Sequence, residues 1–123
     1  MTNRLDALKE LSIVVADTGD PDAVRLHKPQ DCTTNPSLVL AALQSDAYAD
    51  LVAEEIDTAK SEGKDAAALA LDLTVAVGAG LTGIVPGRVS TEVDARLSFD
   101  MHASVDRARA IVEAYEARGV GRD

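Results

Sequence analysis

The sequence contains few aromatic residues, a single cysteine and no long apolar run. Aromatic side chains make up 2% of its 123 residues, so a core must be built from Ala, Val, Leu and Ile. One cysteine, Cys32, excludes an internal disulfide and fits a reducing compartment. No apolar run reaches the length of a membrane span, and no positively charged start precedes an apolar segment. Because 46% of the residues are hydrophobic, we expect a globular, cytoplasmic protein.

Positive charge is scarce as well. Twelve lysines and arginines stand against 21 aspartates and glutamates, which gives a net charge of −9 and a pI near 4.5. This balance argues against nucleic acid or an anionic membrane as a partner. His27 and His102 lie far apart, and neither has a second His or Cys at ligand spacing, so no metal site is expected.

The sequence alternates short strands with helices. Three strands are expected, each with a polar residue at or near its end: a buried strand over residues 12–16 before Asp17, a short strand over 30–34 before Asn35, and one over 88–93, which includes Glu92. Helices are expected over residues 4–11, 21–27, 36–45, 47–62, 65–81 and from 101 to a C-cap at Gly119. Asp20, Asp46 and Asp100 are the expected caps of the helices that follow them. In the last helix, an apolar stripe is expected to face the core: Met101, Val105, Ala108, Val112 and Tyr115.

Two further features suggest chemistry and are explained more simply by structure. Residues 78–83 match the pattern G-x-G-x-x-G of dinucleotide-binding turns, but Pro86 follows too closely for a helix to open there. A glycine-rich helix end before the third strand is the better interpretation. Cys32 lies in a strand with no base nearby, so we expect a small buried side chain rather than a nucleophile.

Asp17, Asn35 and Glu92 share one expected position, at the carboxyl end of a strand. In a barrel or an open parallel sheet, these ends point to a common face where active sites are built. Two carboxylates and a carboxamide supply proton transfer and an orienting hydrogen bond for a polyhydroxylated substrate. Each residue alone is also explained as a turn or cap, most strongly Asn35 before Pro36. Their shared position favours function.

Three segments resemble the first three strand regions of transaldolase, in the same order: residues 16–20 (ADTGD), 29–38 (PQDCTTNPSL) and 85–100 (VPGRVSTEVDARLSFD). The resemblance implies an α/β fold, an incomplete (β/α)8 TIM barrel, with residues 1–123 as the N-terminal part of a single domain. It also implies the pentose phosphate pathway reaction, in which a dihydroxyacetone unit passes from a ketose phosphate such as sedoheptulose 7-phosphate to glyceraldehyde 3-phosphate. The ketose is held as a lysine Schiff base, and no metal or organic cofactor is implied.

By the same resemblance, Asp17 is the acid/base at the carbon–carbon cleavage, Asn35 holds the dihydroxyacetone hydroxyl, and Glu92 works with a water in Schiff-base formation. The Schiff-base lysine would fall on a fourth strand, just beyond Asp123. The expected partners are sugar phosphates and either a complementary C-terminal barrel fragment or further copies of the chain. A truncated product, an expressed fragment and half of a split enzyme remain alternatives.

Two consequences are expected of the chain by itself. The chain should be inactive, because none of its own lysines follows an apolar strand into a buried site. It should be molten, oligomeric or prone to aggregate, because the third strand has an unpaired edge. The alternative function is a non-catalytic half-barrel remnant or an interaction module.

Overall fold

Three short parallel strands form the centre of the molecule in a computed structural model, which describes residues 3–122. β1 (Val15–Asp17) pairs with β2 (Asp31–Thr33), and β2 pairs with β3 (Val89–Ser90), so the strand order follows the sequence. The expected α/β class with parallel strands is therefore confirmed, and the sheet is consistent with part of a TIM barrel. All three strands run in one direction, and their carboxyl ends lie at one edge.

The helices begin and end largely where the sequence predicts. They are α1 (Arg4–Leu11), α2 (Pro21–His27), α3 (Pro36–Leu43), the 3₁₀-helix η1 (Asp46–Tyr48), α4 (Ala49–Glu62), α5 (Ala66–Thr82), the 3₁₀-helix η2 (Ala95–Leu97) and α6 (Met101–Ala117). The side chains of Asp20 and Asp100 accept hydrogen bonds from backbone N–H groups in the first turns of α2 and α6, as expected of caps. The prediction for Asp46 is wrong, because it lies inside η1 and does not cap the helix that follows.

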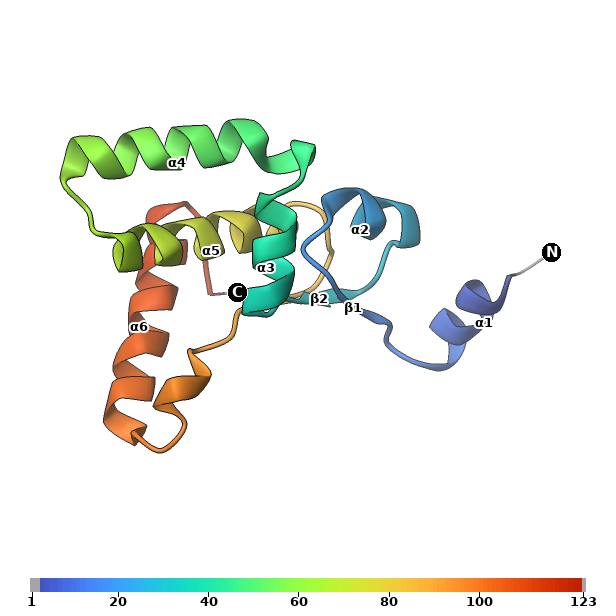
Figure 1. Cartoon of the computed structure of the whole chain (residues 1–123). Coiled ribbons are helices and arrows are strands. Elements are labelled where there is room, and N and C mark those ends of the chain that lie inside the picture. Colours follow the sequence, from blue (N-terminus) through green and yellow to red (C-terminus); the bar gives the residue numbers. More distant parts are fainter. Residues whose placement is uncertain (1–2, 123) are drawn as a thin grey trace.

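Helix α5 is the element against which most of the others pack. Figure 1 shows α4 alongside it and α6 crossing one of its ends, and α5 also contacts α3 and β3. Its residues Val77 and Leu81 are fully buried and contact Cys32 from the central strand in one hydrophobic cluster. The buried, small Cys32 confirms the structural interpretation of this residue. Residues 78–82 belong to α5, so the glycine pattern lies at a helix end and not in a nucleotide-binding turn.

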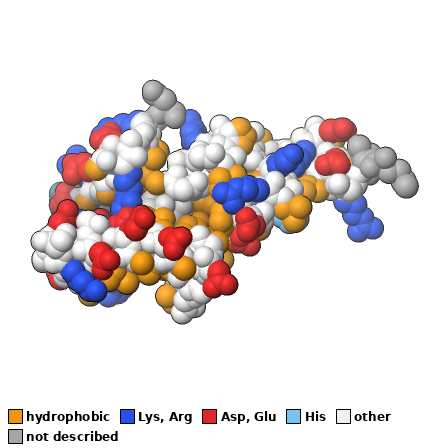
Figure 2. Space-filling view, turned by 90° about the horizontal axis from the view of Figure 1, so that it is seen from above, with side chains coloured by type: hydrophobic (Ala, Val, Ile, Leu, Met, Phe, Trp, Pro, Cys, Tyr) orange, Lys and Arg blue, Asp and Glu red, His pale blue; other side chains and the backbone are white. Residues whose placement is uncertain are grey.

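The helices of the described chain cover only one face of the sheet. Alternation along the strands places Ala16, Cys32 and Val89 on the covered face. Val15 is about half exposed on the other face, and Ile13, just before β1, is 69% exposed. The expectation that residues 12–16 form a buried strand is wrong for this reason. Helix α1 stands apart at the end of the molecule opposite α6, as both Figure 1 and the view from above in Figure 2 show.

The third strand is shorter than predicted. Its last ladder hydrogen bond runs from the Thr34 backbone N–H to the Ser90 carbonyl, 3.1 Å away. Beyond Thr34, the segment that follows β2 leads into α3, whose first residue Pro36 has no N–H to donate. Residues 91–93 therefore have no strand to pair with, although their sequence is typical of one.

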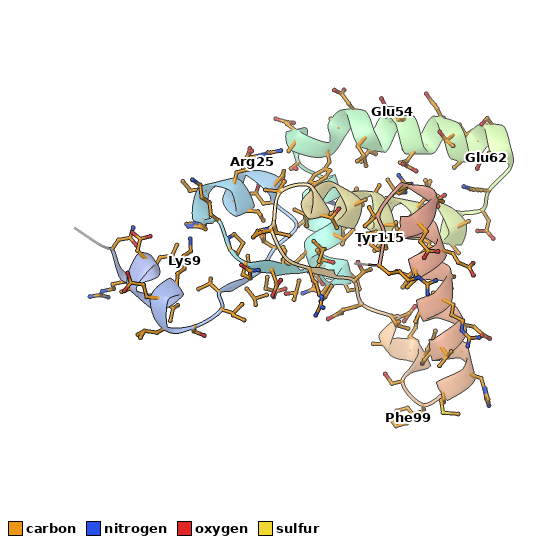
Figure 3. All side chains as sticks on the ribbon, turned by 180° about the vertical axis from the view of Figure 1, so that it is seen from behind. Lys9, Arg25, Glu54, Glu62, Phe99 and Tyr115 are labelled. Atoms are coloured by element: carbon orange, nitrogen blue, oxygen red, sulfur yellow. The ribbon has the colours of Figure 1, made fainter. Side chains whose placement is uncertain are left out.

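The expected apolar stripe of α6 is wrong in part. Ile111 is buried and Tyr115 is largely buried against α5, but Met101, Val105 and Val112 remain exposed on another side of the helix. The apolar positions of α6 thus span more of its circumference than α5 covers. Phe99, at the tip of the turn before α6, is fully exposed and points away from the rest of the chain in Figure 3.

Candidate active site

The structure places Asp17, Asn35 and Glu92 at the same edge of the sheet. Asp17 is the last residue of β1, whereas Asn35 and Glu92 follow β2 and β3 after a short extended stretch. Asp17 is in register with Thr33, and Thr33 with Ser90, so the strands end side by side. This confirms the prediction that the three polar residues share the carboxyl edge, which parallel pairing requires.

Thr33 holds the Asp17 carboxylate. The Thr33 hydroxyl Oγ1 donates a hydrogen bond to Asp17 Oδ1 over 3.0 Å, and the backbone N–H of Thr18 donates to the Thr33 carbonyl over 3.1 Å. Among residues 3–122, no group hydrogen-bonds Asp17 Oδ2, and the side chain is exposed. One oxygen is therefore fixed by the protein while the other faces outward, as a group that exchanges a proton with a ligand needs. Thr33 was not singled out from the sequence, although it lies two residues before Asn35 and therefore faces the same side of an extended segment.

Asn35 serves as the N-cap of α3. Its side-chain oxygen Oδ1 accepts a hydrogen bond from the backbone N–H of Leu38 over 2.9 Å. The capping interpretation is thus confirmed, and it leaves the amide NH₂ of the same side chain as a donor. The cap hydrogen bond fixes the orientation of the side chain. The NH₂ group is therefore held in place at the carboxyl edge of the sheet by this one bond.

Glu92 and Asn35 line a common hollow of about 440 Å³ between α3, α5 and α6. Thr74, Asp94 and Arg107 also line it, but Asp17 does not. The structure therefore brings Asn35 and Glu92 to one hollow, whereas Asp17 lies at the same edge of the sheet but outside that hollow. Glu92 is exposed, and no described residue hydrogen-bonds its carboxylate.

Asp94, in the same hollow, is a charged neighbour unsuited to proton transfer. Arg96 donates from Nε to both carboxylate oxygens of Asp94 at 3.0 Å, and from its backbone N–H at 2.9 Å. These bonds lower the pKa of Asp94 to about 2. The Asp94 carboxylate is therefore ionised at any ordinary pH and does not take up a proton. Of the two carboxylates that line the hollow, Glu92 is the one available for proton transfer.

Other potential chemistry can be set aside for the described part of the chain. Burial raises the pKa of the Cys32 thiol, which disfavours the thiolate a nucleophile requires. Residues 3–122 contain no group of three His, Cys, Asp or Glu side chains that could hold a metal ion. In the same range, no helix has the length and apolar character to cross a membrane.

The lysines lie away from the carboxyl edge. Lys9 is on α1 and donates to the His27 carbonyl, and Lys28 follows the end of α2, before β2 begins. Lys60 is in the last turn of α4, and Lys64, beyond its end, forms ion pairs with Glu62 and Asp72. The candidate site therefore has two carboxylates and an amide but no amine nucleophile among the described residues.

The chain is similar to the proteins of one known family. A family model described as transaldolase/fructose-6-phosphate aldolase matches residues 14–120. Proteins named transaldolase are similar along the whole chain: 54% identity for the one from Rhizobium rhizogenes, 52% for Agrobacterium fabrum and 47% for Haemophilus influenzae. In each case, the alignment covers 100% of this chain and 40% of the relative. The chain thus spans about two-fifths of the length of these relatives.

Proposed function

Since the chain belongs to the transaldolase/fructose-6-phosphate aldolase family, we propose that it supplies the first three strands of a transaldolase active site. Residues 1–123 are then the N-terminal part of one barrel domain. The substrates are sugar phosphates, a ketose phosphate donor and an aldose phosphate acceptor, and the chain acts in the cytoplasm, where Cys32 stays reduced. The single observation that supports this best is the carboxyl edge itself, where Asp17, Asn35 and Glu92 follow three neighbouring parallel strands.

Asp17 is proposed as the acid/base at the carbon–carbon bond that breaks. Cleavage of a β-hydroxy carbonyl-type bond requires removal of the hydroxyl proton, and a carboxylate with one outward oxygen suits this step. The Thr33 hydroxyl occupies Oδ1, so Oδ2 is the oxygen that takes the proton and later returns it to the acceptor sugar. Thr33 thus sets which oxygen reacts.

Asn35 and Glu92 are proposed to act on the dihydroxyacetone unit. The Asn35 NH₂ group donates to a substrate hydroxyl, because its carbonyl oxygen is already engaged by the Leu38 N–H. Glu92 lines the same hollow. In imine hydrolysis its carboxylate takes a proton from the attacking water, and in imine formation the carboxyl group returns that proton, through a water, to the departing carbinolamine hydroxyl. The ionised Asp94 stays paired with Arg96 and takes no part in it.

The Schiff-base lysine is proposed to come from polypeptide outside these residues. None of the chain's lysines lies at the carboxyl edge, and imine chemistry needs an amine that is partly desolvated beside the acid/base groups. Activity therefore depends on a further strand carrying that lysine, in continuation of this chain or in a second one. A complementary barrel fragment is the proposed partner.

The experiment combines the chain with the rest of the Rhizobium rhizogenes relative, beyond the matched 40%. Transfer is assayed with sedoheptulose 7-phosphate and glyceraldehyde 3-phosphate, and a separate sample receives sedoheptulose 7-phosphate and borohydride, which traps the imine. We expect transfer activity, and a reduced imine adduct on the added polypeptide only. Asp17→Asn should lower turnover by about 10²–10⁴-fold. The matched control is Asp22→Asn, since Asp22 is an exposed carboxylate paired with Arg25 on α2.

Two results would contradict the proposal. One is a stoichiometric adduct on any lysine of the 123-residue chain when it is incubated alone. The other is an active combination in which Asp17→Asn and Asp22→Asn behave alike. A combination that folds together but transfers nothing would favour a non-catalytic half-barrel.

A further inference from the structure

The chain has two tyrosines, and each contacts the segment that carries one candidate carboxylate. Tyr115, on α6, is hydrogen bonded through its hydroxyl to Thr91 Oγ1, and Thr91 precedes Glu92. Tyr48, the last residue of η1, donates from its hydroxyl to the Gly19 carbonyl over 2.9 Å, in the loop that follows Asp17. Both bonds join residues far apart in the sequence, so they tie these loops to the helical layer.

The segment around Glu92 depends on the Tyr115 contact. β3 ends at Ser90, so Thr91 has no ladder hydrogen bond to fix it. The Tyr115 ring lies between α5 and α6, where Figure 3 labels it. It approaches Gly78 so closely that a Cβ on Gly78 would lie 1.7 Å from the Tyr115 hydroxyl. A glycine of the sequence pattern that failed as a nucleotide motif therefore provides the space for this side chain.

The loop after Asp17 is held in a similar way by Tyr48. Tyr48 is 5% exposed and belongs to the core cluster. Gly19 packs on α3, since a Cβ there would lie 2.9 Å from the Ala42 Cβ and 3.0 Å from the Leu38 carbonyl. The Tyr48 hydroxyl thus reaches a loop that is already pressed against the helices.

Both phenols stay protonated under ordinary conditions. Burial raises the pKa of Tyr48, and the charge of Asp20 adds to the increase. Burial also raises the pKa of Tyr115, and the hydrogen bond with Thr91 opposes it. Each hydroxyl is therefore available as a neutral hydrogen-bonding group throughout the neutral pH range.

We propose that Tyr115 and Tyr48 are positioning residues: Tyr115 fixes Glu92 through Thr91, and Tyr48 fixes Asp17 through Gly19. Neither hydroxyl reaches the carboxylate it serves. Their effect on catalysis rests on the proposed function of Asp17 and Glu92, whereas their effect on the two segments does not. The experiment therefore measures the segments and the activity separately.

The variants are Tyr115→Phe and Tyr48→Phe, which remove one hydroxyl each, so that each is the matched control of the other. Backbone order parameters are measured by ¹⁵N relaxation on the labelled chain in its combination with the complementary polypeptide. In Tyr115→Phe, we expect residues 91–93 to fall from the rigid value of about 0.85 toward about 0.6, while residues 18–20 keep theirs. Tyr48→Phe should show the opposite pattern. Thr91→Val should reproduce Tyr115→Phe, and Thr91→Ser should not.

Activity in the combined enzyme gives the second measurement. A misplaced catalytic group lowers kcat more than it changes KM, and we expect roughly a 3- to 30-fold loss of kcat in either variant. In that combination, unchanged order at residues 91–93 in both Tyr115→Phe and Thr91→Val would overturn the proposal for Tyr115, and unchanged order at residues 18–20 in Tyr48→Phe would overturn it for Tyr48. If wild-type combinations are inactive, the proposed function fails, while the order parameters still decide the positioning.

Discussion

The two faces of the three-stranded sheet differ in what their side chains contact. On the covered face, Cys32 packs against Val77 and Leu81 of α5, and all three are fully buried. On the open face, Val15 is about half exposed, and within residues 3–122 the Asp17 carboxylate accepts a hydrogen bond only from the Thr33 hydroxyl. Because side chains alternate along a strand, one short segment serves both environments. The stabilising contacts and the candidate chemistry are therefore carried by adjacent residues of the same strand.

The open face is itself divided along the strand direction. Ile13 and Val15, near the amino ends, are apolar, whereas Asp17 and Thr33 at the carboxyl ends are polar. In a closed barrel, the first pair would face packed interior layers and the second pair the active site. The expectation that the chain by itself is molten, oligomeric or prone to aggregate follows from this exposed apolar surface, and it stays a prediction.

The largest expected effect on stability comes from shortening one apolar side chain on the covered side and comparing it with one on the open face. Leu81 is 0% exposed and Ile13 is 69% exposed. Leu81→Ala should lower the free energy of unfolding by about 2–5 kcal/mol, because it leaves a cavity in the core. Ile13→Ala should change it by less than about 0.5 kcal/mol in the chain alone. Urea titrations of the wild type and both variants decide this. A wild type without a cooperative transition would show that the chain alone is molten, and equal losses in the two variants would show that the open face is covered in solution.

The next prediction tests a close contact on the open face. A Cβ on Gly87 would lie 2.0 Å from Asp31 Oδ1 and 2.7 Å from the Gln30 carbonyl. Asp31 cannot simply move, because its carboxylate accepts the Arg88 backbone N–H over 2.7 Å at the start of β3. Gly87→Ala should therefore cost about 1–3 kcal/mol of unfolding free energy.

The matched control is Gly80→Ala, in the last turns of α5, where a Cβ meets nothing within 4 Å. Alanine is the better helix former, so this variant should be more stable by about 0.5–1 kcal/mol. A lower unfolding free energy in Gly87→Ala together with a higher one in Gly80→Ala would show that the β2–β3 contact is tightly packed although it lies on the open face. If both variants were stabilised, the contact at Asp31 would not exist in solution.

Local sequence signals predicted the helices well and the sheet only in part. Caps such as Asp20 and the helix-opening Pro36 act within a few residues, so they can be recognised without the fold. The length of β3 and the exposure of Val15 depend on which neighbours a strand has, and neighbours come from distant segments. The sequence therefore predicted that the strands exist and are parallel, and it misjudged their burial and length.

The candidate site was predicted to a similar degree. Asp17, Asn35 and Glu92 were found because each follows a recognisable strand. Thr33 and Tyr115 were missed in these roles, since their bonds to Asp17 and Thr91 span 16 and 24 positions of sequence. For Tyr115, the sequence held a weak signal. In a chain with few aromatic residues a tyrosine is expected in the core, and a buried tyrosine hydroxyl needs a hydrogen-bond partner. For Thr33, the available signal was its position two residues before Asn35, which places both side chains on the same face of the strand.

A smaller effect is expected in the helical layer above the covered face. Arg118, just after α6, donates from Nη1 and Nη2 to the two carboxylate oxygens of Glu55 on α4, at 2.7 and 2.9 Å. The Glu55 side chain is 15% exposed and the Arg118 side chain 30%, less than at the surface pair of Arg25 and Asp22. Lysine cannot form this two-pronged pair, so Arg118→Lys should cost about 1 kcal/mol. Arg25→Lys, at the exposed pair with Asp22, should cost about 0–0.5 kcal/mol by the same titration. Equal losses would mean that the pair does not join the helices.

The smallest expected effect is the pH dependence of the charges beyond β3. Hydrogen bonds from Arg96 lower the pKa of Asp94 to about 2 in the folded chain, against about 3.9 in the unfolded one. A carboxyl group with a depressed folded pKa contributes stability above its unfolded pKa and loses it as the pH falls from about 4 to 2. Asp94→Asn should flatten the acid limb of the unfolding free energy in that window, and Arg96→Gln should flatten it equally. Because the pair is solvent-exposed, high salt should shrink the difference. An acid limb that neither variant alters would show that the Asp94–Arg96 pair is open in solution, leaving Glu92 with a second available carboxylate beside it.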